Sequence, residues 1–131
     1  MLIGVNNQYQ NRPFELYETE FPELVNKAIS LTKSQRSNDL IVISIPDYAY
    51  TPYGQSGPNP SNTSQEIDMY NNFAENYCLE NDISFINITD ITRLGLVNPA
   101  LVASDNLHPS KLAYKKFVER IYPVALEKLF Y

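Results

Sequence analysis

The sequence predicts an α/β fold in which a parallel sheet carries helices on both faces. Three short runs of apolar and β-branched residues, at 1–5, 40–45 and 83–88, have the composition of strands that are buried on both sides. Segments with apolar residues at helical spacing alternate with these runs. This alternation is typical of parallel sheets, and the length of the chain predicts a single domain over residues 1–131.

In the first half of the chain, the expected elements follow one another closely. The apolar run at 1–5 predicts a strand that begins at the first residue, and the spacing from Phe14 to Leu31 predicts a helix. Within that helix, Pro22 predicts a kink or a restart because proline cannot donate a backbone hydrogen bond. The second strand, 40–45, ends at Pro46. Residues 46–62 hold four prolines and two glycines, which predicts a long and therefore functional loop.

The second half predicts two further helices around a third strand. Thr63 and Glu66 have the spacing of a capping box, which predicts a helix start at Thr63. The strand at 83–88 follows, and the last helix is expected from about Ser110, with Pro123 starting a fresh turn. The residues expected to face the core from these two helices are Ile67, Tyr70, Phe73, Ala74, Tyr77 and Cys78, and then Leu112, Phe117, Val118 and Ile121.

Composition excludes several classes of function. The formal net charge is −5, with fifteen acidic and ten basic residues and no long run of either sign, which argues against a nucleic-acid partner. Cys78 is the only cysteine, and its place on the apolar side of a helix predicts a buried thiol. No apolar stretch approaches the ~20 residues of a membrane span, and no signal peptide opens the chain, so its localisation is left open.

The loops that follow the three strands are expected to share one edge of the sheet, where α/β proteins place their sites. The only histidine, His108, follows Asp105 by three residues. A carboxylate at this distance can accept from the Nδ1–H group, which leaves Nε2 free as a general base. Asn6, after the first strand, can donate to an oxyanion. Taken singly, both patterns also fit ordinary turns, in which Asp105 caps a turn and Gly4 and Asn6 form a strand end.

Two of these segments resemble conserved blocks of the SGNH, or GDSL-type, serine ester hydrolases. Residues 2–8, LIGVNNQ, resemble the block whose Gly-x-Asn supplies the oxyanion asparagine. Residues 105–110, DNLHPS, resemble the Asp-x-x-His-Pro block. Residues 44–48 and 68–70 are also similar, so the resemblance spans almost the whole chain. It implies a three-layer α/β/α, flavodoxin-like hydrolase fold that is incomplete, with about three of the five strands.

The resemblance also implies roles for individual residues. Asn6 is the expected oxyanion donor, His108 the general base and Asp105 the carboxylate that orients it. Tyr48 and Tyr50 are expected to line the substrate pocket. If the site is completed by a nucleophile, the expected substrate is a small ester, which the sequence leaves open among a lipid, an acetylated sugar and other esters. No metal or cofactor is expected.

The sequence departs from the family at the nucleophile. The family's Gly-Asp-Ser turn, and the glycine that completes its oxyanion hole, would precede Met1, and no serine here has a Gly-Asp-Ser context. We therefore expect negligible esterase activity from this chain alone. We also expect the first strand to lie at the sheet edge and to join copies into a homo-oligomer. The alternatives are a non-catalytic binding or assembly module and, less favoured, a nucleotide binder, which lacks a glycine-rich phosphate loop.

Overall fold

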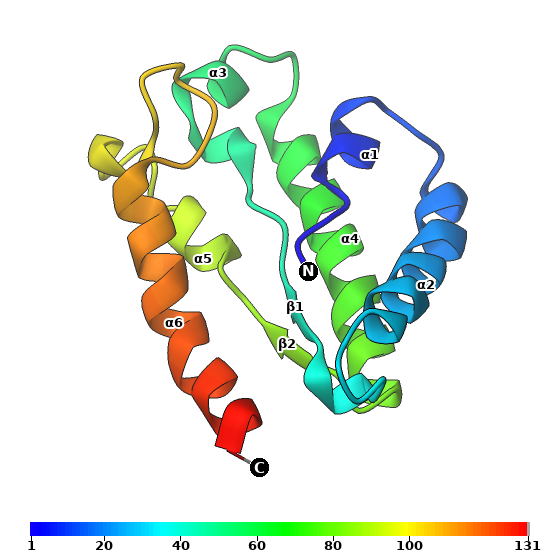
Figure 1. Cartoon of the computed structure of the whole chain (residues 1–131). Coiled ribbons are helices and arrows are strands. Elements are labelled where there is room, and N and C mark those ends of the chain that lie inside the picture. The colour runs from blue at the N-terminus through cyan, green and yellow to red at the C-terminus, as the bar shows by residue number, and fades with distance from the viewer. Residues whose placement is uncertain (131) are drawn as a thin grey trace.

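The computed structural model describes residues 1–130 as a mostly helical α/β protein built around a small parallel sheet (Figure 1). Strands β1 (Ile41–Ile43) and β2 (Ser84–Ile86) pair in parallel, with Val42 opposite Phe85. The helices are α1 (Val5–Tyr9), α2 (Phe14–Ser30), α3 (Pro52–Gln55), α4 (Pro60–Glu80), α5 (Thr89–Thr92) and α6 (Lys111–Phe130). Short 3₁₀ turns occur at Ser37–Asp39 (η1), Tyr48–Tyr50 (η2) and Pro99–Leu101 (η3).

The expected first strand is reduced to a single pairing residue, so the prediction of three strands is wrong. The Met1 carbonyl accepts from the Ile43 N–H at 2.8 Å, and the terminal ammonium group donates to the Ile41 carbonyl. These two bonds place Met1 beside β1 as a parallel neighbour. The chain then leaves the sheet because Gly4 has a φ of 124°, and helix α1 begins at Val5. The named sheet therefore has two strands.

The alternation of side chains along β1 connects two hydrophobic cores. Val42 packs with α2 and α4, whereas Ile41 and Ile43 pack toward α6, as expected for residues that point to opposite faces of a strand. The first core is formed mainly by Tyr17, Phe21, Val25, Ile67, Tyr70, Ala74 and Cys78. The second core contains Ile86, Ile88, Ile91, Leu101, Ala113 and Phe117. The two cores thus meet at β1.

The restart expected at Pro22 and the fresh turn expected at Pro123 are wrong, whereas a kink at Pro22, the other expectation, stays a prediction. Pro22 lies inside α2 and Pro123 lies inside α6, and each helix is assigned as one element. A proline inside a helix removes one backbone hydrogen bond. In α2 the burial of Phe21 and Val25 on either side of Pro22 offsets that loss and keeps the helix continuous.

The predicted capping box is also wrong. Helix α4 starts at Pro60, and the side chain of Asn59 caps it by accepting from the Asn62 N–H at 3.2 Å. Proline is well suited to the first position of a helix, so the start moves upstream from Thr63. The carboxylate of Glu66 instead accepts from the Gln8 side chain at 2.8 Å, which ties α4 to α1.

Of the four residues predicted to face the core from α6, Phe117 and Ile121 do so, whereas Leu112 and Val118 do not. Ala113 and Phe117 are buried, and Ile121 packs partly against the same core. Leu112 and Val118 are exposed, Val118 by 59%. The buried positions follow one another at intervals of four residues, which places 112 and 118 beside the core rather than against it.

The sequence also predicts the burial of Cys78 and the composition of the helices. Cys78 is fully buried, which confirms the predicted setting, and burial raises the pKa of its thiol to about 11. Between residues 1 and 130, none of the helices combines the length and the apolar character that crossing a bilayer requires.

Candidate functional site

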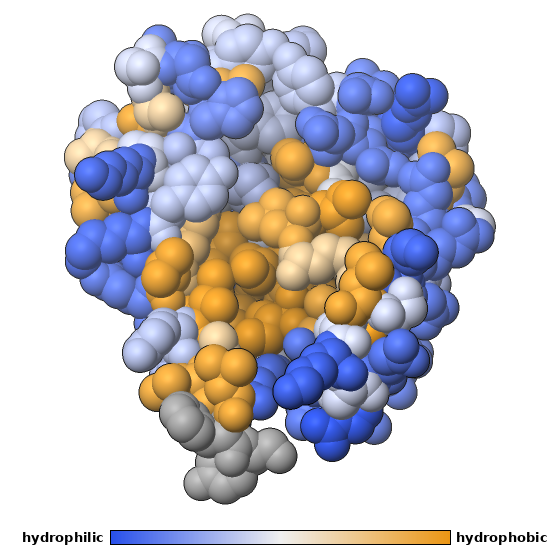
Figure 2. Space-filling model, viewed as in Figure 1, coloured by the Kyte–Doolittle hydropathy of each residue, from blue (hydrophilic) through white to orange (hydrophobic). Residues whose placement is uncertain are grey.

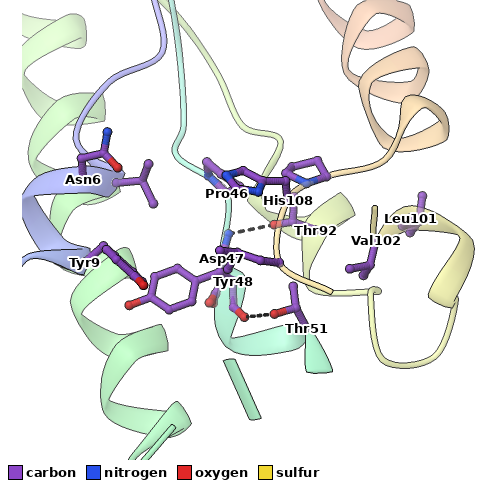
Figure 3. A pocket seen from close by; sticks show the side chains of 13 residues that line it. Asn6, Tyr9, Pro46, Asp47, Tyr48, Thr51, Thr92, Leu101, Val102 and His108 are labelled. Atoms are coloured by element: carbon purple, nitrogen blue, oxygen red, sulfur yellow. Dashed lines mark hydrogen bonds between the residues drawn. The ribbon is translucent and has the colours of Figure 1, made fainter. Parts of the chain in front are cut away.

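A pocket of about 250 Å³ lies where α1, the segment after β1 and the loop before α6 meet (Figure 3). It brings together Asn6, Tyr48 and His108 from these three segments. Its apolar lining comes from Val5, Tyr9, Pro46 and Tyr48 in the first half of the chain and from Leu101, Val102, Leu107 and Pro109 in the second. Its polar lining residues are Asn6, Asp47, Thr51, Thr92 and His108.

His108 and Asp105 form a hydrogen-bonded pair at the edge of this pocket. The Nδ1 atom of His108 lies 2.6 Å from Oδ2 of Asp105. The other carboxylate oxygen accepts from the backbone N–H groups of His108 and Leu107, each at 3.0 Å. These two backbone bonds, followed by the bond to the imidazole, lower the pKa of Asp105 to about 2. Asp105 therefore remains ionised near neutral pH and holds Nδ1, which leaves Nε2 as the ring nitrogen for another partner.

The loop that carries this pair is closed by backbone hydrogen bonds. Ala103 donates to the His108 carbonyl at 2.8 Å, and Ser110 donates to the Leu101 carbonyl at 2.8 Å. Asn106 has a positive φ of 62°, a conformation that asparagine tolerates better than most residues. Its carbonyl accepts from the backbone N–H of Tyr53 at 3.1 Å, so the loop is also attached to α3.

Asn6 reaches the pocket because Gly4 turns the chain out of the sheet. A Cβ atom on Gly4 would lie 2.7 Å from the ring of Tyr17, and the positive φ of this residue also favours glycine. Helix α1 is then anchored by Asn7, which donates to Glu20 on α2 at 3.1 Å, and by the Gln8 bond to α4. The side chain of Asn6 itself is exposed toward the pocket.

Of the two tyrosines expected to line the pocket, the structure places one there. Tyr48 belongs to the lining, and its ring lies edge-on to the ring of Tyr9 with centroids 5.6 Å apart. Tyr9 was missed by the sequence analysis, although it lies one helical turn from Asn6. Tyr50 lies outside the lining, and its ring centroid is 5.9 Å from the guanidinium carbon of Arg93. Its expected role in substrate binding has no support in this geometry.

The pocket floor is held by an ion pair that the sequence analysis also missed. The fully buried carboxylate of Asp47 accepts from Arg93 Nε at 2.9 Å and from Ser64 Oγ at 2.5 Å. Its other oxygen caps η2 by accepting from the Ala49 N–H at 3.0 Å. Arg93 also binds Asp68 on α4 at 2.7 Å. The segment after β1 is therefore fixed from α4 and from the end of α5.

A second polar cluster joins the carboxyl ends of the two strands. The hydroxyl of Ser44 accepts from the Ile88 N–H and from the Thr89 hydroxyl, both at 2.8 Å. It donates to the Asn87 side chain at 3.1 Å. Because Ser44 is buried directly after β1, this cluster sets where the chain enters the pocket.

The described part of the chain, residues 1–130, brings no nucleophile to His108. The imidazole forms its hydrogen bond with Asp105, and no serine hydroxyl within those residues is bonded to it. Ser110, two residues away, donates instead to the Ala100 carbonyl at 2.6 Å. No group of three or more histidine, cysteine or carboxylate side chains in that part of the chain is arranged to hold a metal ion.

Comparison with known proteins gives no match, whether with protein-family models, with curated proteins or with solved structures. The resemblance to SGNH hydrolases therefore stays a prediction from the sequence segments 2–8, 44–48, 68–70 and 105–110.

Proposed function

We propose that this chain supplies the oxyanion asparagine and the acid–base pair of a serine ester hydrolase similar to the SGNH family. The observation that carries the proposal is that Asn6 and His108, from opposite ends of the chain, line one pocket while Asp105 holds the imidazole through Nδ1. In this function, Nε2 of His108 accepts the proton of a nucleophilic hydroxyl. The amide of Asn6 donates to the oxygen that becomes negative as the carbonyl is attacked.

The proposal assigns the nucleophile to a group outside the described residues. A general base without a hydroxyl to activate cannot form an acyl intermediate. The chain alone is therefore expected to form no acyl intermediate, so its hydrolysis of nitrophenyl acetate should show no burst of nitrophenol. A fluorophosphonate, which labels activated serines, is expected to leave it unmodified. Turnover that phosphonate labelling abolishes would contradict the assignment.

A surrogate nucleophile tests the part of the machinery that the chain does hold. Methanol added with nitrophenyl acetate is expected to give methyl acetate in a reaction that His108→Ala removes. Asn6→Ala is expected to slow this reaction by up to ~10²–10³-fold, the range found when one oxyanion donor is lost elsewhere. Asn7→Ala is the matched control because its amide binds Glu20 instead of lining the pocket. Equal effects of the two asparagine substitutions would overturn the proposal.

The same resemblance leads us to propose a three-layer α/β/α, flavodoxin-like architecture for the assembled site. The two cores on opposite sides of β1 support it, since they are what helices on both faces of a sheet would produce. The parallel pairing of Met1 with β1 supports a further strand position at that edge. Backbone hydrogen exchange tests it: Leu2 and Ile3 amides that become protected when the site is completed would support the extra strand.

An assembly module is the second candidate, and an apolar surface favours it. Leu2 and Ile3 are 40% and 38% exposed. Figure 2 shows a hollowed apolar area in the centre of the face where the amino-terminal segment and the two strands lie. We propose that a second copy pairs along this edge, because unpaired strand edges promote association. An in-frame Gly-Asp-Ser segment in the coding sequence before Met1 would favour the hydrolase, and a stop codon there would favour the module.

A further inference from the structure

We infer that the pocket binds the apolar acyl or alkyl group of a small uncharged ester and does not bind a sugar. That the ligand is an ester rests on the proposed function, whereas the preference for an apolar group over a sugar rests on the hydrogen bonds of the lining residues. Figure 3 shows the residues concerned around the pocket.

Three of the five polar residues that line the pocket use their side-chain groups within the protein. The Asp47 carboxylate is occupied by Arg93, Ser64 and the Ala49 N–H. The hydroxyl of Thr51 donates to the Tyr48 carbonyl at 2.7 Å and accepts from the Gly54 N–H at 3.0 Å.

Thr92 is occupied in the same way. Its hydroxyl donates to the Thr89 carbonyl at 2.8 Å and accepts from the Asp47 N–H at 2.9 Å. The phenol of Tyr9 is bonded to that of Tyr53 at 2.7 Å. Among the lining side chains, this leaves the amide of Asn6, Nε2 of His108 and the phenol of Tyr48 to meet a ligand. A sugar ring carries several hydroxyl groups, and each one buried without a partner loses its hydrogen bonds to water, which opposes binding. An ester carbonyl needs one donor, which Asn6 can supply.

The charge of the lining and the volume of the pocket further restrict which ligands the pocket can bind. The one carboxylate in the lining is already paired with Arg93, so the pocket presents no unpaired fixed charge to a charged ligand. Its volume of about 250 Å³ compares with the ~150 Å³ cavity that holds benzene in another protein. By that comparison, the pocket takes a group of roughly six to ten carbon atoms.

Methyl ketones test this inference because they carry a carbonyl and an alkyl chain and cannot be hydrolysed. Titration of the ¹⁵N-labelled chain with ketones from 2-butanone to 2-dodecanone is expected to shift the amide signals of Thr51 and Val102. Each added methylene is expected to tighten binding about fourfold, the ratio that corresponds to ~0.8 kcal/mol per buried methylene. The gain is expected to stop once the chain exceeds the pocket. Methyl glucoside is expected to shift neither signal.

Substitutions in the pocket lining test whether the ketones bind in this pocket. Val102→Phe fills the lining and is expected to weaken binding of the longer ketones by about tenfold or more. Val97→Phe is the matched control, because Val97 is 80% exposed and lies outside the lining. Leu107→Phe serves as a second filling variant should Val102→Phe fail to fold. Binding without dependence on chain length, equal effects of the Val102 and Val97 substitutions, or tighter binding of methyl glucoside would each overturn the inference.

The ketone experiment also separates this inference from the proposed function. Suppose that the ketones bind as expected but that methanolysis does not depend on His108. This result would contradict the proposed function and leave the apolar preference of the pocket in place. His108-dependent methanolysis that runs faster with acetylated glucose than with nitrophenyl hexanoate would support the proposed function and contradict the apolar preference of the pocket.

Discussion

The Nε atom of Arg93 lies 2.9 Å from Oδ2 of Asp47, a carboxylate with no exposed surface. The contact joins the segment after β1 to the residue that follows α5, and both segments contribute to the pocket floor. The pocket therefore depends on an ion pair between residues that are far apart in the sequence.

Asp47→Asn is expected to destabilise the protein by about 2–3 kcal/mol, because it leaves Arg93 without the charge that offsets its partial burial. This value is below the ~3–5 kcal/mol typical of fully buried pairs, since Arg93 is 30% exposed. Urea unfolding measures the change. Asp90→Asn breaks the exposed pair with Arg120 and serves as control, with an expected loss under ~1 kcal/mol. Equal losses for the two variants would contradict the role of Asp47.

The carboxylate of Asp105 is expected to titrate near pH 2 instead of at its ordinary value of 3.8. A depressed pKa means that the ionised form stabilises the loop fully above about pH 4. This contribution is lost as the pH falls from 3.8 through about 2. Carbon-detected NMR of the Asp105 carboxyl group measures the midpoint.

His108→Ala provides the control for that titration. The variant removes the imidazole bond but keeps the backbone N–H donors, which are the larger causes of the shift. The pKa of Asp105 is therefore expected to rise part of the way and to stay below 3.8. A return to the ordinary value would show that the imidazole, and not the backbone, holds the carboxylate.

Ser44→Ala is expected to cost about 1–3 kcal/mol, the penalty for leaving buried groups without a partner. The substitution removes the acceptor for the Ile88 N–H, whereas the Thr89 hydroxyl keeps the Ile45 carbonyl as an acceptor at 2.8 Å. Thermal or urea unfolding measures the loss. Ser61→Ala, at an exposed position near the start of α4, is the control and is expected to change stability little.

The exposed first segment is expected to associate with a second copy. Light scattering on fractions from size-exclusion chromatography should show a mass that rises with concentration. Leu2→Lys should restore the monomer, because a charge on a strand edge opposes pairing. Leu79→Lys, near the end of α4, carries the same charge at another exposed leucine and should leave the association intact. A monomeric parent chain at high concentration would rule this interface out.

The parts of the site that the sequence predicted depend on short spacings or on general topology. Asp105 and His108 are three residues apart, so one turn of chain suffices to pair them. The approach of Asn6 to His108 follows from the rule that loops after parallel strands share an edge. These positions required no knowledge of how distant side chains pack.

The parts that the sequence missed depend on particular distant contacts. The pairing of Asp47 with Arg93 has no local pattern that would reveal it. The first strand ends early because Gly4 adopts a backbone conformation that apolar periodicity cannot predict. Tyr50 turns toward Arg93 because η2 and α3 fold the long loop into short helical turns.

Tyr53 forms hydrogen bonds with both sides of the pocket, helix α1 and the loop before α6. Its phenol oxygen lies 2.7 Å from that of Tyr9, on the helix that bears Asn6, while its backbone holds the loop of His108 through Asn106. A shift of α1 or of the His108 loop is thus transmitted to the other through Tyr53. The width of the pocket opening therefore depends on both the Tyr9–Tyr53 and the Tyr53–Asn106 hydrogen bonds. A ligand that widens the opening has to strain both of them.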